Sequence, residues 1–349
     1  MPACAPLKLA ILGIGEGTHI GGSLARGASQ LGLESIWFDA EEAWRAPWIF
    51  RSFFWHFADR RPTHLGQHSK RLVELCARTK PNLLVTTGMA PLTASALHSL
   101  KRLGIVSLNY STDDPWNSVM SSRWYLEALP AYDFVFTTRR ANIDDFRRHG
   151  CKEVYWLPFG YDETLFYKDF NNSPGIMSHD ILFVGGADSD RVKFVNEFMH
   201  LGAPIALAGG YWDRHQSFKS LALGLISPDH IRLLTAAAKV NLCLVRRANR
   251  DGHVMRSFEI AAAGGCMLAE DTVEHREIFG PDGDAVVYFR NPREAAERAK
   301  LLLANASERL RLARCLHRRI ADGRNTYTHR LATMLTIAAK KSPKQFPLC

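Results

Sequence analysis

The chain has 349 residues, of which 46% are hydrophobic and 23% are charged, with a formal net charge of +9. This balance excludes a disordered or low-complexity chain, and the length favours two globular domains. No run of eighteen apolar residues occurs, which argues against a membrane-spanning helix. The seven cysteines are scattered without a C-x-x-C pair, so we expect free thiols and no bound metal.

The excess of basic residues suits an anionic partner. No nucleic-acid-binding motif accompanies it, so we expect no nucleic acid partner. A solvated helix face near the C-terminus explains part of the excess, through Arg309, Arg311, Arg314, Arg318 and Arg319. The opening apolar run is too short for a signal peptide, and we expect a cytoplasmic protein, with peripheral contact at the inner membrane face as an open alternative.

Short apolar runs alternate with longer helical patterns along the whole chain, as in parallel sheets covered by helices on both faces. The strands expected in the first half are Lys8–Gly13, Glu34–Phe38, Asn82–Thr87, Ile105–Asn109, Phe134–Thr137 and Val154–Leu157. Those expected in the second half are Ile181–Gly185, Ile205–Ala208, Asn241–Val245, Cys266–Ala269 and Val286–Phe289. Each half has enough strands for its own doubly wound sheet, which predicts an α/β fold.

Proline and glycine interrupt the pattern between the halves. The segment Leu157–Asp162 is followed by the polar stretch Asn171–Gly175, which resembles a linker. We therefore predict an N-terminal domain over residues 1–165 and a C-terminal domain over residues 166–339. The basic tail, residues 340–349, is expected to be disordered.

Glycines follow the first expected strand, in the loop LGIGEGTHIGGSLARG at residues 12–27. Such a loop can face a bound phosphate or an acceptor. The candidates in it are Gly15, His19, Gly21 and Gly22. A dinucleotide-binding loop is the alternative, with Asp39 as the ribose-binding acid, but Thr18 replaces the third glycine of that pattern.

An aromatic and basic stretch follows the second expected strand. Its members are Trp44, Trp48, Phe50, Phe53, Phe54 and Trp55, with Arg45, Arg51, Arg60 and Arg61. It could lie on a membrane or hold a lipid-linked acceptor. We favour packing of these aromatic side chains in a core, with the arginines at the surface.

Asp113 and Asp114 follow the strand at Ile105–Asn109, at the end where ligands bind in parallel sheets. A carboxylate at this point could bind an acceptor hydroxyl or assist its deprotonation, so both are candidate catalytic residues. A turn is the alternative, because Asp-Pro favours turns.

The segment from Arg246 to Gly283 has the densest group of candidate residues. It follows the strand at Asn241–Val245, and Val254–Ala263 has helical character that Gly264 and Gly265 can end. Three carboxylates suited to sugar hydroxyls are expected at one edge of the sheet, on Asp251, Glu259 and Glu277. A diphosphate would suit the start of the helix after Gly252 and three basic side chains nearby. These are Arg246, Arg247 and Arg250.

Asp251-x7-Glu259 resembles the Glu-x7-Glu motif of the retaining group 1 glycosyltransferases, with Asp in place of the first Glu. Glu277 lies eighteen residues beyond Glu259, where those enzymes often carry a further Glu, and Glu274 is the alternative. The phrases NRDGHVMRSFEIAAAGG and EHREIF resemble the CgeB-like, spore-maturation-type branch. Further matching phrases are TDDPW, FTTRRANIDDF, LPFGYDETLF and NTYTHRL, and the resemblance covers roughly residues 105–331.

The resemblance implies a GT-B fold, in which two Rossmann-like domains face each other across a cleft and the final helix crosses back to the first domain. It implies that Asp251 contacts the donor sugar, that Glu259 contacts donor hydroxyls, and that the backbone at Gly252-His253 meets sugar or phosphate. Arg191 stands where the family often has a base for the diphosphate. The Asp at position 251 departs from the pattern and leaves the sugar open.

We therefore expect a glycosyltransferase that moves a sugar from a nucleotide-diphosphate sugar to an unknown acceptor, with retention of configuration. No D-x-D motif supports a metal, so neither metal nor other cofactor is expected. Catalytic candidates are Asp113, Asp114, His19 and Asp251. Donor-binding candidates are Gly15, Arg191, Arg250, Gly252, His253, Glu259, Gly264, Gly265 and Glu277. The alternatives are a non-catalytic nucleotide-sugar-binding protein and a nicotinamide-dependent oxidoreductase.

Overall fold

The computed structural model describes residues 7–168, 177–343 and 346. The expected linker at 171–175 and half of the expected disordered tail, residues 344–345 and 347–349, lie outside these residues. The chain divides into two compact units, residues 1–158 with 327–349 and residues 159–326. The chain therefore passes from the first unit to the second after Pro158, before the expected boundary at 165. The final helix belongs to the first unit, as the resemblance implied.

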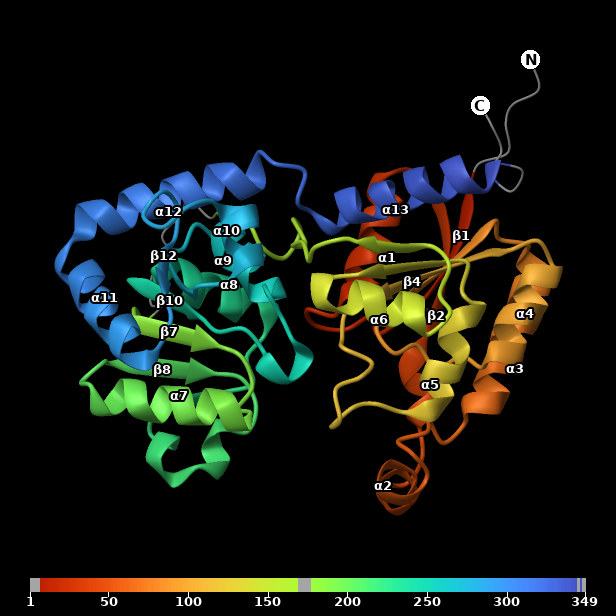
Figure 1. Ribbon diagram of the computed structural model, residues 1–349, viewed down its shortest axis with the longest axis horizontal. Helices are drawn as coiled ribbons and strands as arrows, with labels where there is room; N and C mark the ends of the chain where they lie inside the picture. Colours follow the sequence, from red (N-terminus) through yellow and green to blue (C-terminus); the bar gives the residue numbers. More distant parts are fainter. Residues whose placement is uncertain (1–6, 169–176, 344–345, 347–349) are drawn as a thin grey trace. The chain divides into compact units, whose positions relative to one another are not determined.

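The first unit is built on a parallel sheet in the order β2-β1-β3-β4-β5-β6 (Figure 1). Its strands are β1 (Lys8–Gly13), β2 (Glu34–Asp39), β3 (Leu83–Thr87), β4 (Val106–Ser111), β5 (Phe134–Thr137) and β6 (Val154–Trp156). Its α-helices are α1 (Ile20–Gln30), α2 (Trp48–Phe57), α3 (Leu65–Thr79), α4 (Ala94–Arg102), α5 (Arg123–Ala128), α6 (Ile143–Arg148) and α13 (Tyr327–Lys341). Short 3-10 helices are η1 (Ala40–Trp44), η2 (Leu129–Ala131) and η3 (Arg140–Asn142).

The second unit has a parallel sheet in the order β12-β11-β10-β7-β8-β9 (Figure 1). Its strands are β7 (Ile181–Val184), β8 (Ile205–Ala208), β9 (Ala222–Gly224), β10 (Val240–Cys243), β11 (Met267–Glu270) and β12 (Val287–Phe289). Its α-helices are α7 (Ser189–His200), α8 (Pro228–Ala237), α9 (Met255–Ala263), α10 (Val273–Phe279), α11 (Pro292–Ala304) and α12 (Ala306–Ala321). Three 3-10 helices complete it, η4 (Trp212–Arg214), η5 (Gln216–Phe218) and η6 (Arg247–Asn249).

These sheets confirm the predicted α/β class. Each expected strand is present within about two residues of its predicted ends, and most are short apolar runs that become buried, although the edge strand β2 contains no buried residue. The prediction missed β9, whose three residues are only partly buried and carry no strong apolar run. The single helical pattern expected from Asn291 to about Ala338 is three helices, α11, α12 and α13. The last of them continues through Lys341, so the first residues of the expected tail are helical.

Helix α13 packs along α1 within the first unit (Figure 1). A Cβ on Gly27 of α1 would lie 3.0 Å from the Cα of Thr328, so glycine permits this close approach. The Nε of Arg330 donates to the carbonyl oxygen of Pro158 over 2.9 Å. Helix α13 is thus held to the first unit by its packing against α1 and by the hydrogen bond from Arg330 to Pro158.

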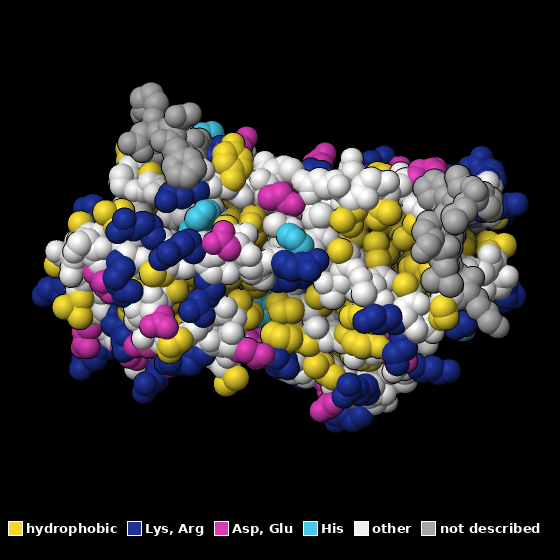
Figure 2. Space-filling model, turned by 90° about the horizontal axis from the view of Figure 1, so that it is seen from above, with side chains coloured by type: hydrophobic (Ala, Val, Ile, Leu, Met, Phe, Trp, Pro, Cys, Tyr) yellow, Lys and Arg dark blue, Asp and Glu magenta, His cyan; other side chains and the backbone are white. Residues whose placement is uncertain are grey.

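The basic residues of α12 form a solvated face, as expected. Arg311 pairs with Glu308 at 2.7 Å, and its guanidinium also donates to the carbonyl oxygens of Gly283 and Asp284. Figure 2 shows Lys and Arg side chains spread over the visible face among Asp and Glu side chains. We therefore assign no anion-binding role to this helix.

The expectation that the aromatic stretch packs in a core is wrong for α2. This helix contains no buried residue, and Trp48, Phe50 and Phe53 are each more than half exposed. The ring of Trp55 lies 6.4 Å from that of Trp44 in η1. The aromatic pattern predicted a helix but did not reveal which side, if any, it would bury.

Candidate functional site at the edge of the second sheet

The strand order of the second unit locates a ligand-binding edge. Strands β8 and β9 lie on one side of β7, whereas β10, β11 and β12 lie on its other side. The loops after β7 and β10 therefore diverge, and parallel sheets bind ligands in the crevice at such a point. The side chains placed there are the candidates for ligand binding.

Arg191 connects the loops that follow β7 and β10. It lies in the first turn of α7, and its guanidinium donates to the carbonyl oxygen of Gly186 after β7 and to that of Leu244 after β10, both over 3.3 Å. Burial lowers the pKa of Arg191, while the charges of Asp188 and Asp251 raise it and that of Arg246 lowers it. The charge of Asp251 thus acts on Arg191.

Asp188 is a member of this site that sequence reasoning missed. It caps α7 by accepting a hydrogen bond from the backbone N–H of Arg191 over 3.0 Å. Its other oxygen, Oδ2, lies 3.6 Å from Nε of Arg191 and 3.7 Å from Nε of Arg246. An Asp directly before a helix was the available signal, because that residue type is a preferred N-cap. One carboxylate therefore balances two arginines at the crevice.

The remaining bases of the loop are arranged around the same edge. Arg247 pairs with Glu270 at 2.7 Å, and this hydrogen bond and charge raise the pKa of Arg247. Glu270 also accepts from the backbone N–H of Val245 over 3.0 Å. Arg250 is exposed and has a left-handed backbone, with φ of 52°. A hollow of about 200 Å³ lies beside this group and is lined by Arg191, Arg247 and Glu270.

His253 is held by two hydrogen bonds and has no ring nitrogen left for a ligand. Its Nδ1 lies 2.6 Å from Oε2 of Glu274, and its Nε2 accepts from the backbone N–H of Phe159 over 3.1 Å. Because Nε2 is an acceptor, the ring is neutral with its proton on Nδ1. The side chain of His253 is therefore structural, although its backbone lies in the predicted loop.

The carboxylate beside Gly252 belongs to Glu274, whereas Glu277 is exposed. A Cβ on residue 252 would overlap the carboxyl carbon of Glu274, which explains glycine at this position. Glu277 lies three residues further along α10, about 4.5 Å along the helix axis. Glu274, and not Glu277, is thus the carboxylate that lies against Gly252, and the donor-binding role of Glu277 stays a prediction.

Glu259 is the least accessible of the predicted carboxylates. It lies on α9, is 2% exposed, and forms an ion pair with Arg256. Burial raises its pKa, the charge of Arg256 lowers it, and that of Asp162 raises it. The side chain of Glu259 therefore faces the interior of the unit, and Arg256, its partner one turn earlier, was missed from the sequence.

Gly264 and Gly265 lie at the opposite edge of the sheet, before β11 begins. Gly264 ends α9 with φ of 79°, and a Cβ on Gly265 would lie 2.6 Å from Nδ2 of Asn241. Their expected donor-binding role is therefore not supported by position. They terminate the helix and permit close packing.

A buried polar network lies beneath the crevice. His275 accepts from the hydroxyl of Ser257 over 3.0 Å through Nε2 and donates to the carbonyl oxygen of Glu270 over 2.7 Å through Nδ1. Burial lowers the pKa of His275 from 6.5 to about 4. Cys243 contacts the same hydroxyl at 3.4 Å, and burial raises the pKa of this thiol to about 11, which makes it unreactive.

The network predicts acid sensitivity. The unfolded chain takes up a proton at His275 near pH 6.5 but the folded protein only near pH 4, so stability falls as the pH falls through this window. At about 1.4 kcal/mol per pH unit, the loss between pH 6.5 and pH 5 is on the order of 2 kcal/mol. We expect urea unfolding at pH 7.5 and pH 5 to show this difference in wild type and its reduction in His275→Gln. An unchanged difference in His275→Gln, or an equal reduction in the exposed control His215→Gln, would contradict the assignment.

In the first unit, the predicted residues lie in loops that follow β1 and β4. Gly15 and His19 are exposed, and His19 precedes α1 without capping it through its side chain. Gly21 and Gly22 serve packing, because a Cβ on Gly21 would lie 2.8 Å from the carbonyl oxygen of Ile14. Asp39 accepts from the backbone N–H of Glu41 and from Arg45, so its carboxylate is engaged locally.

Asp113 and Asp114 differ in accessibility. Asp113 is partly buried beside Gly88, where a Cβ would lie 3.7 Å from its Oδ2. Asp114 is 1% exposed, and its Oδ1 accepts from the backbone N–H of Trp116 and from the side chain of Asn142. Asp114 thus stabilises the turn, which was the alternative interpretation. Asp113 remains the candidate that could meet an acceptor.

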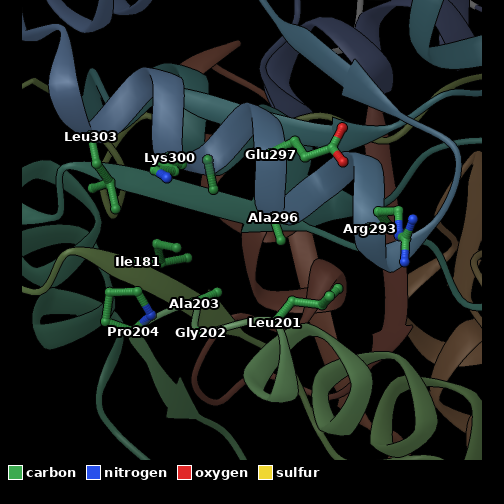
Figure 3. A pocket seen from close by; sticks show the side chains of 11 residues that line it. Ile181, Leu201, Gly202, Ala203, Pro204, Arg293, Ala296, Glu297, Lys300 and Leu303 are labelled. Atoms are coloured by element: carbon green, nitrogen blue, oxygen red, sulfur yellow. The ribbon is translucent and has the colours of Figure 1, made fainter.

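A second cavity of the second unit lies away from the crevice. It measures about 530 Å³ and is lined by Ile181 at the start of β7, by the turn between α7 and β8, and by α11 (Figure 3). Figure 3 shows the charged side chains of Arg293, Glu297 and Lys300 on α11 and apolar side chains below them. The amino end of β7 is the edge opposite Arg191, so this cavity is not part of the site.

Among the described residues, no group of three His, Cys, Asp or Glu side chains has a metal-binding arrangement. None of the described helices combines the length and hydropathy needed to cross a bilayer.

Comparisons with known proteins show a family similarity over part of the chain and a similarity of fold over the whole chain. Residues 191–336 match the family described as "Glycosyl transferase-like". No curated protein matches the sequence of the chain. The chain is similar in structure to sucrose-phosphate synthase from Thermosynechococcus elongatus, with 12% identity, a TM-score of 0.72, and coverage of 97% of this chain and 100% of that one.

Two further structures show how widely this fold is shared. Anabaena HepE in complex with UDP-glucose has 14% identity and a TM-score of 0.60, with 95% of this chain and 100% of that one covered. A putative UDP-N-acetylglucosamine 2-epimerase from Listeria monocytogenes has 11% identity and a TM-score of 0.55, with 97% of each chain covered. The whole chain therefore has a GT-B-type α/β fold, and its residues 191–336 carry the match to the glycosyl transferase-like family.

Proposed function

We propose that the protein transfers a sugar from a nucleotide-diphosphate sugar to an acceptor. The observation that carries this proposal is the pair of arginines, Arg191 and Arg246, around Asp188 at the strand-order switch of the unit that matches the glycosyl transferase-like family. A crevice with this charge suits a diphosphate. UDP-glucose is the first donor to test, because HepE was solved in complex with it.

The proposed chemistry is electrostatic. As the bond from sugar to diphosphate breaks, negative charge grows on the departing phosphate oxygens. Arg191 is held in place by two backbone carbonyls, and Arg246 is 45% exposed at its side chain, so the first supplies a fixed charge and the second can reach the ligand. The first turn of α9 adds its N–H groups and helix dipole. Asp251 would bind the sugar hydroxyls.

Several finer points belong to the same proposal. We propose retention of configuration and membership of the CgeB-like branch on the motifs around Asp251-x7-Glu259. We propose a cytoplasmic location on the scattered cysteines, which form no C-x-x-C pair. We also propose that transfer needs no divalent metal, because arginines occupy the place where a metal would neutralise the diphosphate. The acceptor would meet Asp113 and the loop containing Gly15 and His19.

Binding of UDP by isothermal titration calorimetry tests the diphosphate site. We expect Arg246→Gln to weaken binding roughly tenfold, the cost of one charge-assisted hydrogen bond. Arg314→Gln, an exposed arginine of α12, is the matched control and should bind like wild type. EDTA should leave binding unchanged. Equal binding by Arg246→Gln, or loss of binding in EDTA, would contradict this assignment.

Turnover is tested with a panel of nucleotide-sugars, by release of the nucleoside diphosphate and by NMR of the product anomer. Transfer with retention supports the full proposal. Binding of UDP without turnover of any donor would favour the non-catalytic binding protein. Interconversion of the donor sugar without release of UDP would instead indicate an epimerase.

A further inference from the structure

Helix α2 presents an apolar surface to solvent within the first unit. Its large side chains are exposed by 71% at Trp48, 61% at Ile49, 57% at Phe50, 55% at Phe53 and 79% at Phe57. Residues 49, 53 and 57 are spaced four apart, so they lie along one stripe of the helix. Figure 1 shows α2 standing apart from the sheet at the lower edge of the unit. A contiguous exposed apolar surface of this kind marks an interaction site.

Hydrogen bonds hold the segments before and after α2, whereas the helix itself is exposed. The guanidinium of Arg60 donates to the carbonyl oxygens of Ser121 and Ser118, over 2.9 Å and 3.2 Å. The backbone N–H of His64 donates to the carbonyl oxygen of Ala43 over 2.9 Å, which ties the end of the excursion to its beginning. Specific hydrogen bonds thus hold the projection at both ends, and an apolar helix is displayed between them.

The charge on α2 itself has one sign. The helix contains Arg51 and His56 but no acidic residue, and Arg45, Arg51 and Arg61 are exposed around it. Of the flanking acids, Glu41 is exposed, whereas Asp59 and Glu42 are engaged. Asp59 accepts from the backbone N–H of Arg123 over 2.5 Å, and Glu42 lies 3.8 Å from Arg45 and 3.9 Å from Arg71. Aromatic side chains with a basic border suit the interface of an anionic bilayer.

We propose that α2 docks the protein on an anionic lipid surface. Its Ile49, Phe53 and Phe57 stripe enters the boundary between headgroups and acyl chains, and the neighbouring arginines meet the lipid phosphates. A second copy of the chain fits less well. A ten-residue helix is about 15 Å long, and its face falls well short of the roughly 800 Å² per partner of a stable interface.

Co-sedimentation of the full chain with vesicles tests this proposal without any donor or acceptor, so its outcome is independent of the proposed activity. Vesicles of phosphatidylcholine alone are compared with vesicles that also contain phosphatidylglycerol. We expect wild type to bind the anionic vesicles, less so as salt is raised. Phe53→Gln with Phe57→Gln should weaken binding about tenfold or more, because two phenyl groups no longer leave water.

The matched control replaces two exposed leucines on other helices, Leu301→Gln with Leu310→Gln, which are 71% and 62% exposed. This control should bind like wild type. Arg51→Gln with Arg61→Gln should lower binding to anionic vesicles only. Circular dichroism establishes that each variant is folded.

Three outcomes would overturn the proposal. Wild type may stay in solution with anionic vesicles, or the Phe53/Phe57 variant may sediment as fully as wild type. Sedimentation velocity gives the third, a wild-type dimer that the Phe53/Phe57 variant converts to monomer while vesicle binding is unchanged. That result would make α2 an interface between copies.

Discussion

Asp251→Asn is expected to lower kcat/KM for the donor roughly 10- to 100-fold, the cost of losing a charge-assisted hydrogen bond to a sugar hydroxyl. Asp251 follows β10, at the strand-order switch, and its charge acts on Arg191. The Asn side chain has nearly the same shape but no charge, so the fold should be retained. Steady-state kinetics with the donor identified by turnover gives the ratio.

Asp284→Asn is the matched control, because Asp284 is exposed and precedes β12 at the other edge of the same sheet. It should leave kcat/KM at the wild-type value. The urea midpoints of both variants should equal that of wild type. Full activity in Asp251→Asn would remove Asp251 from the donor site, whereas a lowered midpoint would assign it to stability.

The second large effect is expected on stability. Glu259→Ala should lower the free energy of unfolding by about 3 kcal/mol, because it leaves the charge of Arg256 largely buried and without its partner. The Arg256 side chain is 15% exposed and that of Glu259 is 3% exposed. The matched control is Glu297→Ala, an exposed Glu on α11, which should change stability by less than about 0.5 kcal/mol.

A double-mutant cycle separates the ion pair from other effects. If the pair is the cause, Arg256→Ala combined with Glu259→Ala costs less than the sum of the single changes, because neither charge is then left alone. Additive losses would contradict the pairing. If Glu259→Ala keeps wild-type stability but fails to bind UDP, Glu259 is a ligand and not a structural partner.

Much of the candidate site could be predicted from short stretches of sequence. The apolar strand before Arg246, the helix from Met255 and the acid at 251 could each be recognised from short stretches of chain. Two features of the site could not be predicted from the sequence. Spacing alone could not choose between Glu274 and Glu277, since the choice depends on which turn of α10 faces Gly252. Nor could it show that Glu259 faces Arg256 inside the unit.

The sequence by itself determined the elements, because an apolar run or a helical period is a property of neighbouring residues. It placed each expected strand and the α/β class, and it predicted that the segment after β10 binds a ligand. Tertiary structure decided the strand order, which brings Arg191 from one half of the second unit to the loop of Asp251. It also decided what is covered. Gly264 and Gly265 lie at the far edge of the sheet. Helix α2 is exposed although it is rich in aromatic residues. Burial depends on what packs against a segment and not on its own residues.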